Sequence, residues 1–103
     1  MNQNIVKEKY FLQFLVNAER NQAKLFLKIM NKKQMEAVLA IIYNIIHGTF
    51  KVKQEIIDGV RMYRNQIYKI VDKKIAIVKR KELMIRRVHE LITLLRVAVK
   101  EIF

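Results

Sequence analysis

Apolar residues recur at steps of three and four along most of the 103-residue chain. This spacing is typical of amphipathic helices, because positions three and four apart share one face of a helix. Polar residues or glycine interrupt the pattern between successive helical stretches. We expect helices at residues 5–18, 21–30, 32–47, 51–71 and 78–103.

This pattern predicts an all-α fold. The chain has no Pro and only two Gly, whereas a protein with many β-hairpins needs such residues in its turns. A chain of about this length buries enough apolar surface for one core, so residues 1–103 are expected to form a single helical domain. We predict a compact bundle of four to five helices with a long C-terminal amphipathic helix.

The helix expected at residues 32–47 is apolar on nearly every side, as the stretch MEAVLAIIYNIIH shows. A helix of this kind in a soluble protein is surrounded by other helices or lies in an oligomer interface. Asn31 is a suitable N-cap, and Gly48 accepts the left-handed conformation that ends many helices. We therefore expect this helix at the centre of the core.

The last helical stretch carries the most regular pattern in the chain. Its apolar residues alternate at steps of four and three, which is the heptad pattern of helices that pack along their length. A helix of about 25 residues is roughly 37 Å long, so it is expected to span the domain or to pair with a copy of itself. The candidate oligomer or protein interface consists of Met84, Val88, Leu91, Leu95, Ala98 and Ile102.

Three local expectations follow from the same pattern. The helix at 21–30 should bury Leu25, Phe26, Ile29 and Met30. Gly59 lies inside the expected helix at 51–71, where glycine costs about 1 kcal/mol relative to alanine, so a close helix crossing is expected there. The stretch at 75–77, which is Ile-Ala-Ile, is interpreted as a short buried linker.

The charge of the chain is strongly unbalanced. Its 21 basic and 9 acidic residues leave a net charge of +12, and residues 61–87 alone hold ten basic and two acidic side chains. A surface with such a surplus attracts polyanions. Lys79 and Arg86 are seven positions apart, as are Arg80 and Arg87, so two cationic rows should lie side by side on one helix face.

The candidate nucleic-acid-binding residues are Arg61, Arg64, Lys73, Lys74, Lys79, Arg80, Lys81, Arg86 and Arg87. Cations of this kind bind phosphates without reading the base sequence. A solvated helix surface that binds nothing remains the alternative explanation. Tyr63 lies on the apolar stripe and is expected in the core, whereas Tyr68 fits either the core or a position that stacks on bases.

Other chemistry finds little support. The chain has no Cys, and its two histidines, His47 and His89, are too few for a three-histidine metal site, so both are interpreted as structural. No glycine-rich phosphate loop is present. We therefore expect no metal, no cofactor and no enzyme activity.

The longest apolar run, residues 37–46, is about half of what a bilayer span requires, and the polar first residues do not resemble a secretion signal.

Residues 32–87 resemble the short, lysine-rich reading frames of animal adintoviruses and Maverick (Polinton) elements, which have been likened to adenovirus core proteins. The similarity rests on the Asn-Ile-Ile-His-Gly segment at 44–48, on Ile67 and Val71, and on the motifs Asp-Lys-Lys-Ile at 72–75 and Lys-Arg-Lys-Glu-Leu at 79–83. It covers about half of the chain.

The resemblance implies a small virion-associated protein that binds packaged DNA or the inner capsid. The basic positions that it carries over are Lys73, Lys74, Lys79, Arg80 and Lys81. Location in the virion, and in the host nucleus if the protein is viral, follows from the same resemblance. The apolar helix after Arg87 favours a folded protein that also contacts other proteins.

Three functions are therefore open. The first is non-specific binding of nucleic acid, with double-stranded DNA as the expected partner, by a helical protein that is expected to be a homo-oligomer. The second is a minor capsid or assembly protein that docks on capsid proteins through its apolar helices and meets acidic protein through its basic residues. The third, which we consider weaker, is binding to a membrane surface by the cationic last helix.

Overall fold

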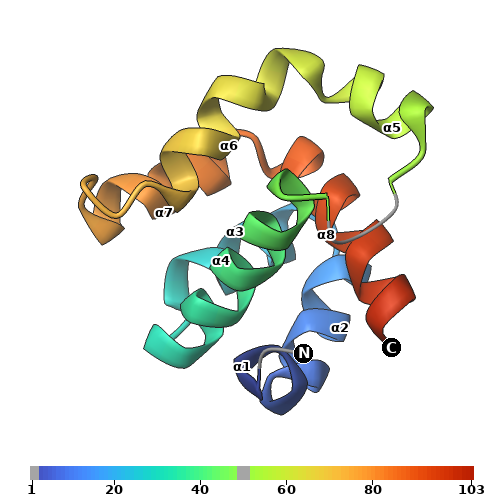
Figure 1. Ribbon diagram of the computed structural model, residues 1–103. Helices are drawn as coiled ribbons and strands as arrows, with labels where there is room; N and C mark the ends of the chain where they lie inside the picture. The colour runs from blue at the N-terminus through green and yellow to red at the C-terminus, as the bar shows by residue number, and fades with distance from the viewer. Residues whose placement is uncertain (1–2, 49–51) are drawn as a thin grey trace.

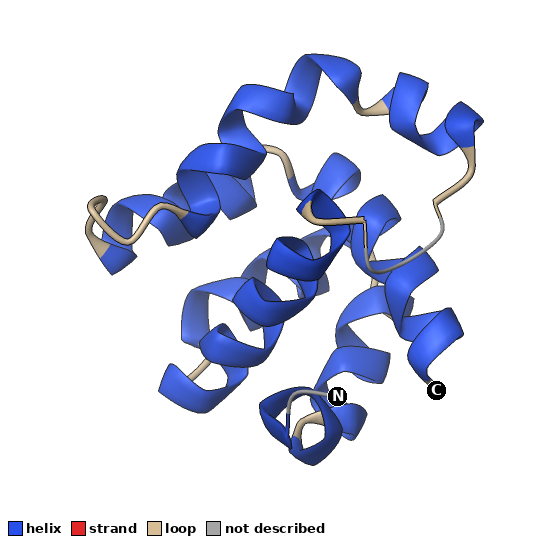
Figure 2. Cartoon of the chain, viewed as in Figure 1, coloured by secondary structure: helices blue, strands red, loops and turns tan. Residues whose placement is uncertain are grey.

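Helices make up most of the chain, and Figures 1 and 2 show them joined by short loops. The computed structural model describes residues 3–48 and 52–103. The described part contains no β-strand, which confirms the all-α class. The helices are α1 (Gln3–Lys7), α2 (Lys9–Asn17), α3 (Arg20–Ile29), α4 (Lys32–Ile46), α5 (Gln54–Gly59), the 3-10 helix η1 (Arg61–Tyr63), α6 (Arg64–Val71), α7 (Ile77–Arg86) and α8 (Val88–Ile102).

The predicted bundle of four to five helices is wrong in detail, because the chain forms more and shorter helices. The first expected helix is divided at Glu8 into α1 and α2. The stretch expected as one helix from 51 to 71 is divided into α5, η1 and α6, and its expected first residue lies outside the described residues.

The centre of the core is α4, as predicted. A reciprocal pair of hydrogen bonds starts this helix: Gln34 N–H donates to Asn31 Oδ1 over 2.8 Å, and Asn31 N–H donates to Gln34 Oε1 over 2.9 Å. At the other end Gly48 adopts a φ of +71°, a conformation that favours glycine. Between these ends α4 contacts α1, α6 and α8, and it buries Met35, Ala37, Val38, Ile41 and Ile42.

The long C-terminal helix is a wrong prediction. The chain leaves the helical conformation at Arg87, whose φ and ψ are −119° and 46°, and this residue separates α7 from α8. At this break the contacts change, because α7 lies against α3 and α6, whereas α8 lies mainly against α2 and α4 and only in part against α3. One straight helix could not follow both surfaces.

The heptad pattern in this region is real but faces inward. Five of its residues are buried within the single chain, and Ile102 is partly buried against them. The prediction that these positions form a surface for a second copy is therefore corrected. The corrected residues are Met84, Val88, Leu91, Leu95, Ala98 and Ile102.

Helix α6 and helix α7 lie side by side and form a helical hairpin, drawn in yellow and orange at one edge of the molecule in Figure 1. We call residues 61–87, which comprise η1, α6, the connecting turn and α7, the basic hairpin. In the turn, the Asp72 carboxylate accepts a hydrogen bond from Lys74 N–H over 2.9 Å. The predicted buried linker is wrong, because Ala76 in this connection and Ile77, the first residue of α7, are exposed.

Two further expectations fail for reasons of packing. Helix α3 turns Ala23 and Leu27 to the core, so that Leu25 and Ile29 are 53% and 65% exposed, although Met30 is buried as expected. Gly59 ends α5, and apart from its chain neighbours and its own helix backbone no atom of the described residues lies within 4 Å of the point where a Cβ would stand. No close helix crossing therefore requires glycine at this position.

Candidate nucleic-acid interface

The basic hairpin exposes most of the cations that the sequence analysis selected. Lys73 and Lys74 lie in the turn between its helices, and Lys79 and Arg86 are exposed one heptad apart along α7. Arg61 and Arg64 lie at the opposite end of the hairpin, in η1 and at the start of α6. The structure therefore gathers these cations on one supersecondary unit, in separate groups along it.

Few carboxylates neutralise these cations. Within the described residues the ion pairs are Arg61 with Asp58 at 2.9 Å and Arg87 with Glu90 at 3.8 Å, and both lie at the surface. Exposed pairs of this kind contribute about 0–1 kcal/mol and are screened by salt. The exposed cations of the hairpin that have no carboxylate partner among the described residues include Arg64, Lys73, Lys74, Lys79 and Arg86.

Arg80 does not belong to this surface, which corrects its assignment as a phosphate-binding residue. Its side chain is only 7% exposed, and its Nε has no hydrogen-bond partner within the described residues. A buried N–H group without a hydrogen-bond partner loses its hydration and gains little in return. The two adjacent cationic rows expected on α7 are thus reduced to one row, formed by Lys79 and Arg86.

Lys81 is also used inside the molecule. Its Nζ donates a hydrogen bond of 2.9 Å to the carbonyl oxygen of Met30, the C-cap residue that follows α3. A cation in this place satisfies a free carbonyl group and opposes the negative end of the helix dipole. This contact joins α7 to α3 across 51 positions of the sequence.

The two tyrosines near the hairpin occupy different environments. Tyr63 is buried, as predicted, and its hydroxyl oxygen has no partner among the described residues. Burial raises the pKa of the Tyr63 phenol far above its usual value, the negative charge of Glu90 raises it further, and the positive charge of Arg87 opposes this shift. Tyr68 is partly exposed, and the guanidinium carbon of Arg64 lies 5.7 Å from the centre of its ring.

A groove that the sequence analysis missed lies beside the base of the hairpin. It has a volume of about 630 Å³ and is formed by the end of α4, by α5, by η1 and α6, and by α8. Aliphatic side chains make up most of its lining, and Arg61, Arg64 and Tyr68 supply the polar side chains. Only the three-dimensional fold brings these four segments together, so no linear motif could have revealed the groove.

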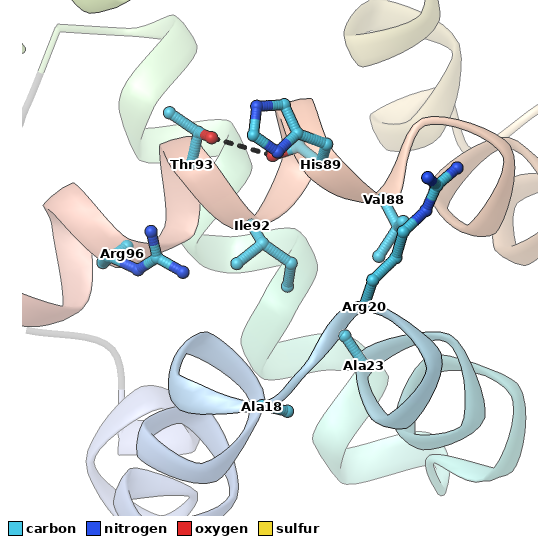
Figure 3. A pocket seen from close by; sticks show the side chains of 8 residues that line it. All are labelled: Ala18, Arg20, Ala23, Val88, His89, Ile92, Thr93 and Arg96. Atoms are coloured by element: carbon cyan, nitrogen blue, oxygen red, sulfur yellow. Dashed lines mark hydrogen bonds between the residues drawn. The ribbon is translucent and has the colours of Figure 1, made fainter.

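A smaller hollow of about 120 Å³ lies between α3 and α8, and Figure 3 shows its lining. Arg96 donates from Nε and Nη2 to the carbonyl oxygen of Val16 over 3.2 and 3.0 Å, so its guanidinium is already engaged at the end of α2. Thr93 Oγ1 donates to the carbonyl oxygen of His89 over 2.8 Å. Arg96 and Thr93 are therefore engaged with backbone carbonyl oxygens, and Arg20 and His89 supply the other polar side chains of the lining.

The two histidines belong to no cluster of metal-ligating side chains among the described residues. The His47 ring lies 4.2 Å from the Tyr43 ring, measured between centroids, and His47 caps the end of α4. Among the described residues, no group of three or more His, Asp or Glu side chains could hold a metal ion. In the same part of the chain, no helix has the length and apolar character needed to cross a bilayer.

Comparisons of the chain with protein-family models, with curated proteins and with solved structures found no match.

Proposed function

We propose that the protein binds nucleic acid non-specifically, through contacts between phosphates and the exposed cations of the basic hairpin. The observation that carries this proposal is a group of exposed hairpin cations that have no carboxylate partner among the described residues, which includes Arg64, Lys73, Lys74, Lys79 and Arg86. Each cation that meets a phosphate releases a counterion, which makes binding depend steeply on salt. Five such contacts correspond to a slope of about −4.5 in log affinity against log salt.

The position of the hairpin supports this proposal. The turn with Lys73 and Lys74 lies at an edge of the molecule, where a long polymer can approach it without meeting the helical core (Figure 1). Lysine side chains in an exposed turn bind phosphates as mobile point charges, which suits contacts with many sequences. We therefore assign the hairpin to backbone contacts and no residue to base recognition.

The resemblance of residues 32–87 to the adintovirus and Maverick reading frames favours packaged double-stranded DNA as the polyanion. On this proposal the protein is a component of the virion, and it meets the DNA in the host nucleus or inside the particle. Arg80 and Lys81 leave the proposed contact set, because one is buried and the other is bonded to Met30.

The test compares two variants that lose the same charge. The hairpin variant carries Gln at Lys73, Lys74, Lys79 and Arg86, and the control carries Gln at the exposed positions Lys28, Lys32, Lys33 and Lys100. Binding to a random-sequence DNA duplex is measured by fluorescence anisotropy over a series of salt concentrations. We expect the hairpin variant to have a salt slope shallower by about 3.6, and the control to differ from wild type by less than about 1.

Equal weakening in both variants would show that net charge alone attracts the DNA and would reject the hairpin as the site. Binding by wild type that hardly changes with salt, or the absence of binding at low salt, would reject the proposed function itself. Circular dichroism of each variant confirms that the helices remain folded.

A second function is favoured by a separate observation. Val6, Tyr10 and Phe14 are spaced by four residues along α1 and α2, and the two aromatic side chains are 72% and 69% exposed. Their helix α2 faces the core with Leu12, Leu15 and Val16 instead. Exposed aromatic side chains of this kind are typical of contacts with other proteins. This stripe fits an assembly protein that docks on capsid proteins or on a second copy of itself.

Analytical ultracentrifugation tests the self-association part of this alternative. A wild-type oligomer that dissociates when Tyr10 and Phe14 are replaced by Ser would support it. A wild-type monomer at all concentrations would leave only contacts with other proteins, and would contradict the predicted homo-oligomer.

A further inference from the structure

We propose that the groove formed by α4, α5, α6 and α8 binds a long-chain fatty acid, with the aliphatic chain against the apolar lining and the carboxylate at Arg64. Arg64 also belongs to the proposed phosphate contacts, whereas the apolar lining of the groove takes no part in them. No residue pattern in the linear sequence indicates this groove, because its walls come from four separate segments.

The first argument is the lining of the groove. Its apolar side chains are aliphatic apart from Tyr68: Ile45, Ile46, Val52, Ile57, Val60, Ile67 and Leu94. Its volume of about 630 Å³ falls within the range of about 300–1,000 Å³ that is usual for pockets that bind small molecules. Such pockets combine a mostly apolar wall with a few polar groups that orient the ligand, and this groove has that composition.

The second argument is the charge at the groove. Arg61 and Arg64 both line it, and no Asp or Glu side chain belongs to the lining among the described residues. Asp58 already pairs with Arg61 at 2.9 Å, whereas Arg64 has no carboxylate partner in the described part of the chain. A guanidinium group binds a carboxylate through two parallel hydrogen bonds, so one free arginine matches one anionic head group.

The position of Arg64 leaves its guanidinium group able to bind a carboxylate. Its guanidinium carbon lies 5.7 Å from the centre of the Tyr68 ring, and Tyr68 also lines the groove. An aromatic face beside a cation restricts the cation without neutralising its charge. The cation is therefore placed at the groove and remains able to bind an anion.

Other occupants fit these observations less well. A second copy of the chain would bring together two molecules that each carry a net charge of +12. An acidic amphipathic helix of another protein has the right charge, but helices with their side chains are about 10–12 Å across and present several charges rather than one. The single free arginine and the size of the groove favour a single-chain anion.

The proposal is tested by isothermal titration calorimetry of the full chain with sodium dodecanoate below its micelle concentration. Two variants address the two ends of the ligand: Arg64→Gln removes the cation, and Ile57→Trp fills the groove at a side chain that is 43% exposed and therefore tolerant of change. Arg86→Gln is the matched control, because it removes one arginine charge outside the groove.

We expect wild type and Arg86→Gln to bind dodecanoate in a saturable manner with equal affinity. Arg64→Gln should bind at least about tenfold more weakly, since hydrogen bonds between charged groups contribute about 1.5–3 kcal/mol and each 1.4 kcal/mol is a factor of ten. Ile57→Trp should lose binding. Dodecyltrimethylammonium, which has the same chain and a cationic head, should bind more weakly than dodecanoate.

Four results would overturn the proposal: no saturable binding by wild type, equal weakening by Arg64→Gln and Arg86→Gln, unchanged binding by Ile57→Trp, or equal affinity for the cationic detergent. A designed acidic amphipathic peptide that binds wild type but not Ile57→Trp, while dodecanoate fails to bind, would assign the groove to a partner helix instead. Loss of DNA binding would not affect these outcomes, because the calorimetry contains no nucleic acid.

Discussion

The helical core and the basic hairpin differ in the charge that they carry and in the polar atoms that they bury. The helical core, which we define as α1 to α4 with α8, contains apolar side chains that are completely inaccessible, such as Ile5, Leu12, Ile41 and Leu95. The basic hairpin also contains completely inaccessible side chains, Ile70 and Met84, whereas its Ile67, beside the groove, stays 8% exposed. The hairpin also holds the buried side-chain atoms that lack a hydrogen-bond partner within the described residues: Tyr63 Oη, Gln66 Oε1 and Arg80 Nε.

The core supplies most of the stability of the fold, whereas the hairpin carries the proposed binding sites. Close packing of apolar side chains supplies most of the favourable free energy of folding, and the core contains most of it here. The hairpin concentrates like charges, which repel one another, and it leaves buried polar atoms unpaired. Both proposed binding sites involve the hairpin. Proteins commonly depart from the best local packing where they bind something.

The largest expected change in the free energy of unfolding distinguishes an aliphatic residue of the core, Leu95, from an aliphatic residue of the hairpin, Ile67. Leu95→Ala leaves a closed cavity in the core and should lower the free energy of unfolding by about 2–5 kcal/mol. Ile67 lines the groove, so Ile67→Ala widens an open surface and should cost only about 1–2 kcal/mol. Urea unfolding followed by circular dichroism measures both values. Equal losses would show that the hairpin is packed as tightly as the core.

An intermediate change in the free energy of unfolding is expected when Arg80 is replaced. Arg80→Met keeps much of the side-chain volume and removes a largely buried cation whose Nε has no hydrogen-bond partner among the described residues, so it should raise the free energy of unfolding by about 1–3 kcal/mol. Arg86→Met, at an exposed position of the same helix, should change it by less than about 0.5 kcal/mol. Thermal unfolding of both variants is the measurement. A lower stability of Arg80→Met would mean that the guanidinium stabilises the fold.

The smallest change in the free energy of unfolding is expected for a substitution at Tyr63, and it appears only at alkaline pH. Burial raises the pKa of Tyr63, so above pH of about 10 the unfolded chain loses this proton while the folded chain keeps it. The unfolded state then binds fewer protons, and stability falls as the pH rises. Tyr63→Phe should alter stability at neutral pH by less than about 1 kcal/mol and should lose less stability than wild type above pH of about 10.

Urea unfolding of both proteins at several pH values tests this expectation. The lysine side chains titrate in the same range, but they are common to both proteins and cancel in the comparison. Identical losses of stability in alkali would show that the Tyr63 phenol is not protected by burial.

Local interactions made parts of the fold predictable. Asn31 caps α4 and Gly48 ends it, because a side-chain cap and a left-handed residue act within one turn of the helix. The interruption at Asp72 is likewise local, since its carboxylate bonds to the backbone two residues later. The burial of Tyr63 followed from its place on an apolar stripe.

Other features depended on contacts between distant segments. At the break at Arg87 the chain passes from contacts with α3 and α6 to contacts mainly with α2 and α4, and no glycine or proline marks it in the sequence. Arg80 and Arg86 share a residue type and a helix, yet one is buried and the other is exposed. The heptad pattern correctly indicated an apolar face but could not say whether that face meets its own chain or another.

The sequence by itself determined the helical class, the main helix ends and the surplus of positive charge, because periodicity, caps and composition act locally or sum over the whole chain. Only the tertiary structure decided which cations stay in solvent, which apolar face fills the core, and that four segments enclose a groove beside Arg64. These properties depend on how helices far apart in the sequence pack together, and that packing is set by the shapes of all their side chains at once.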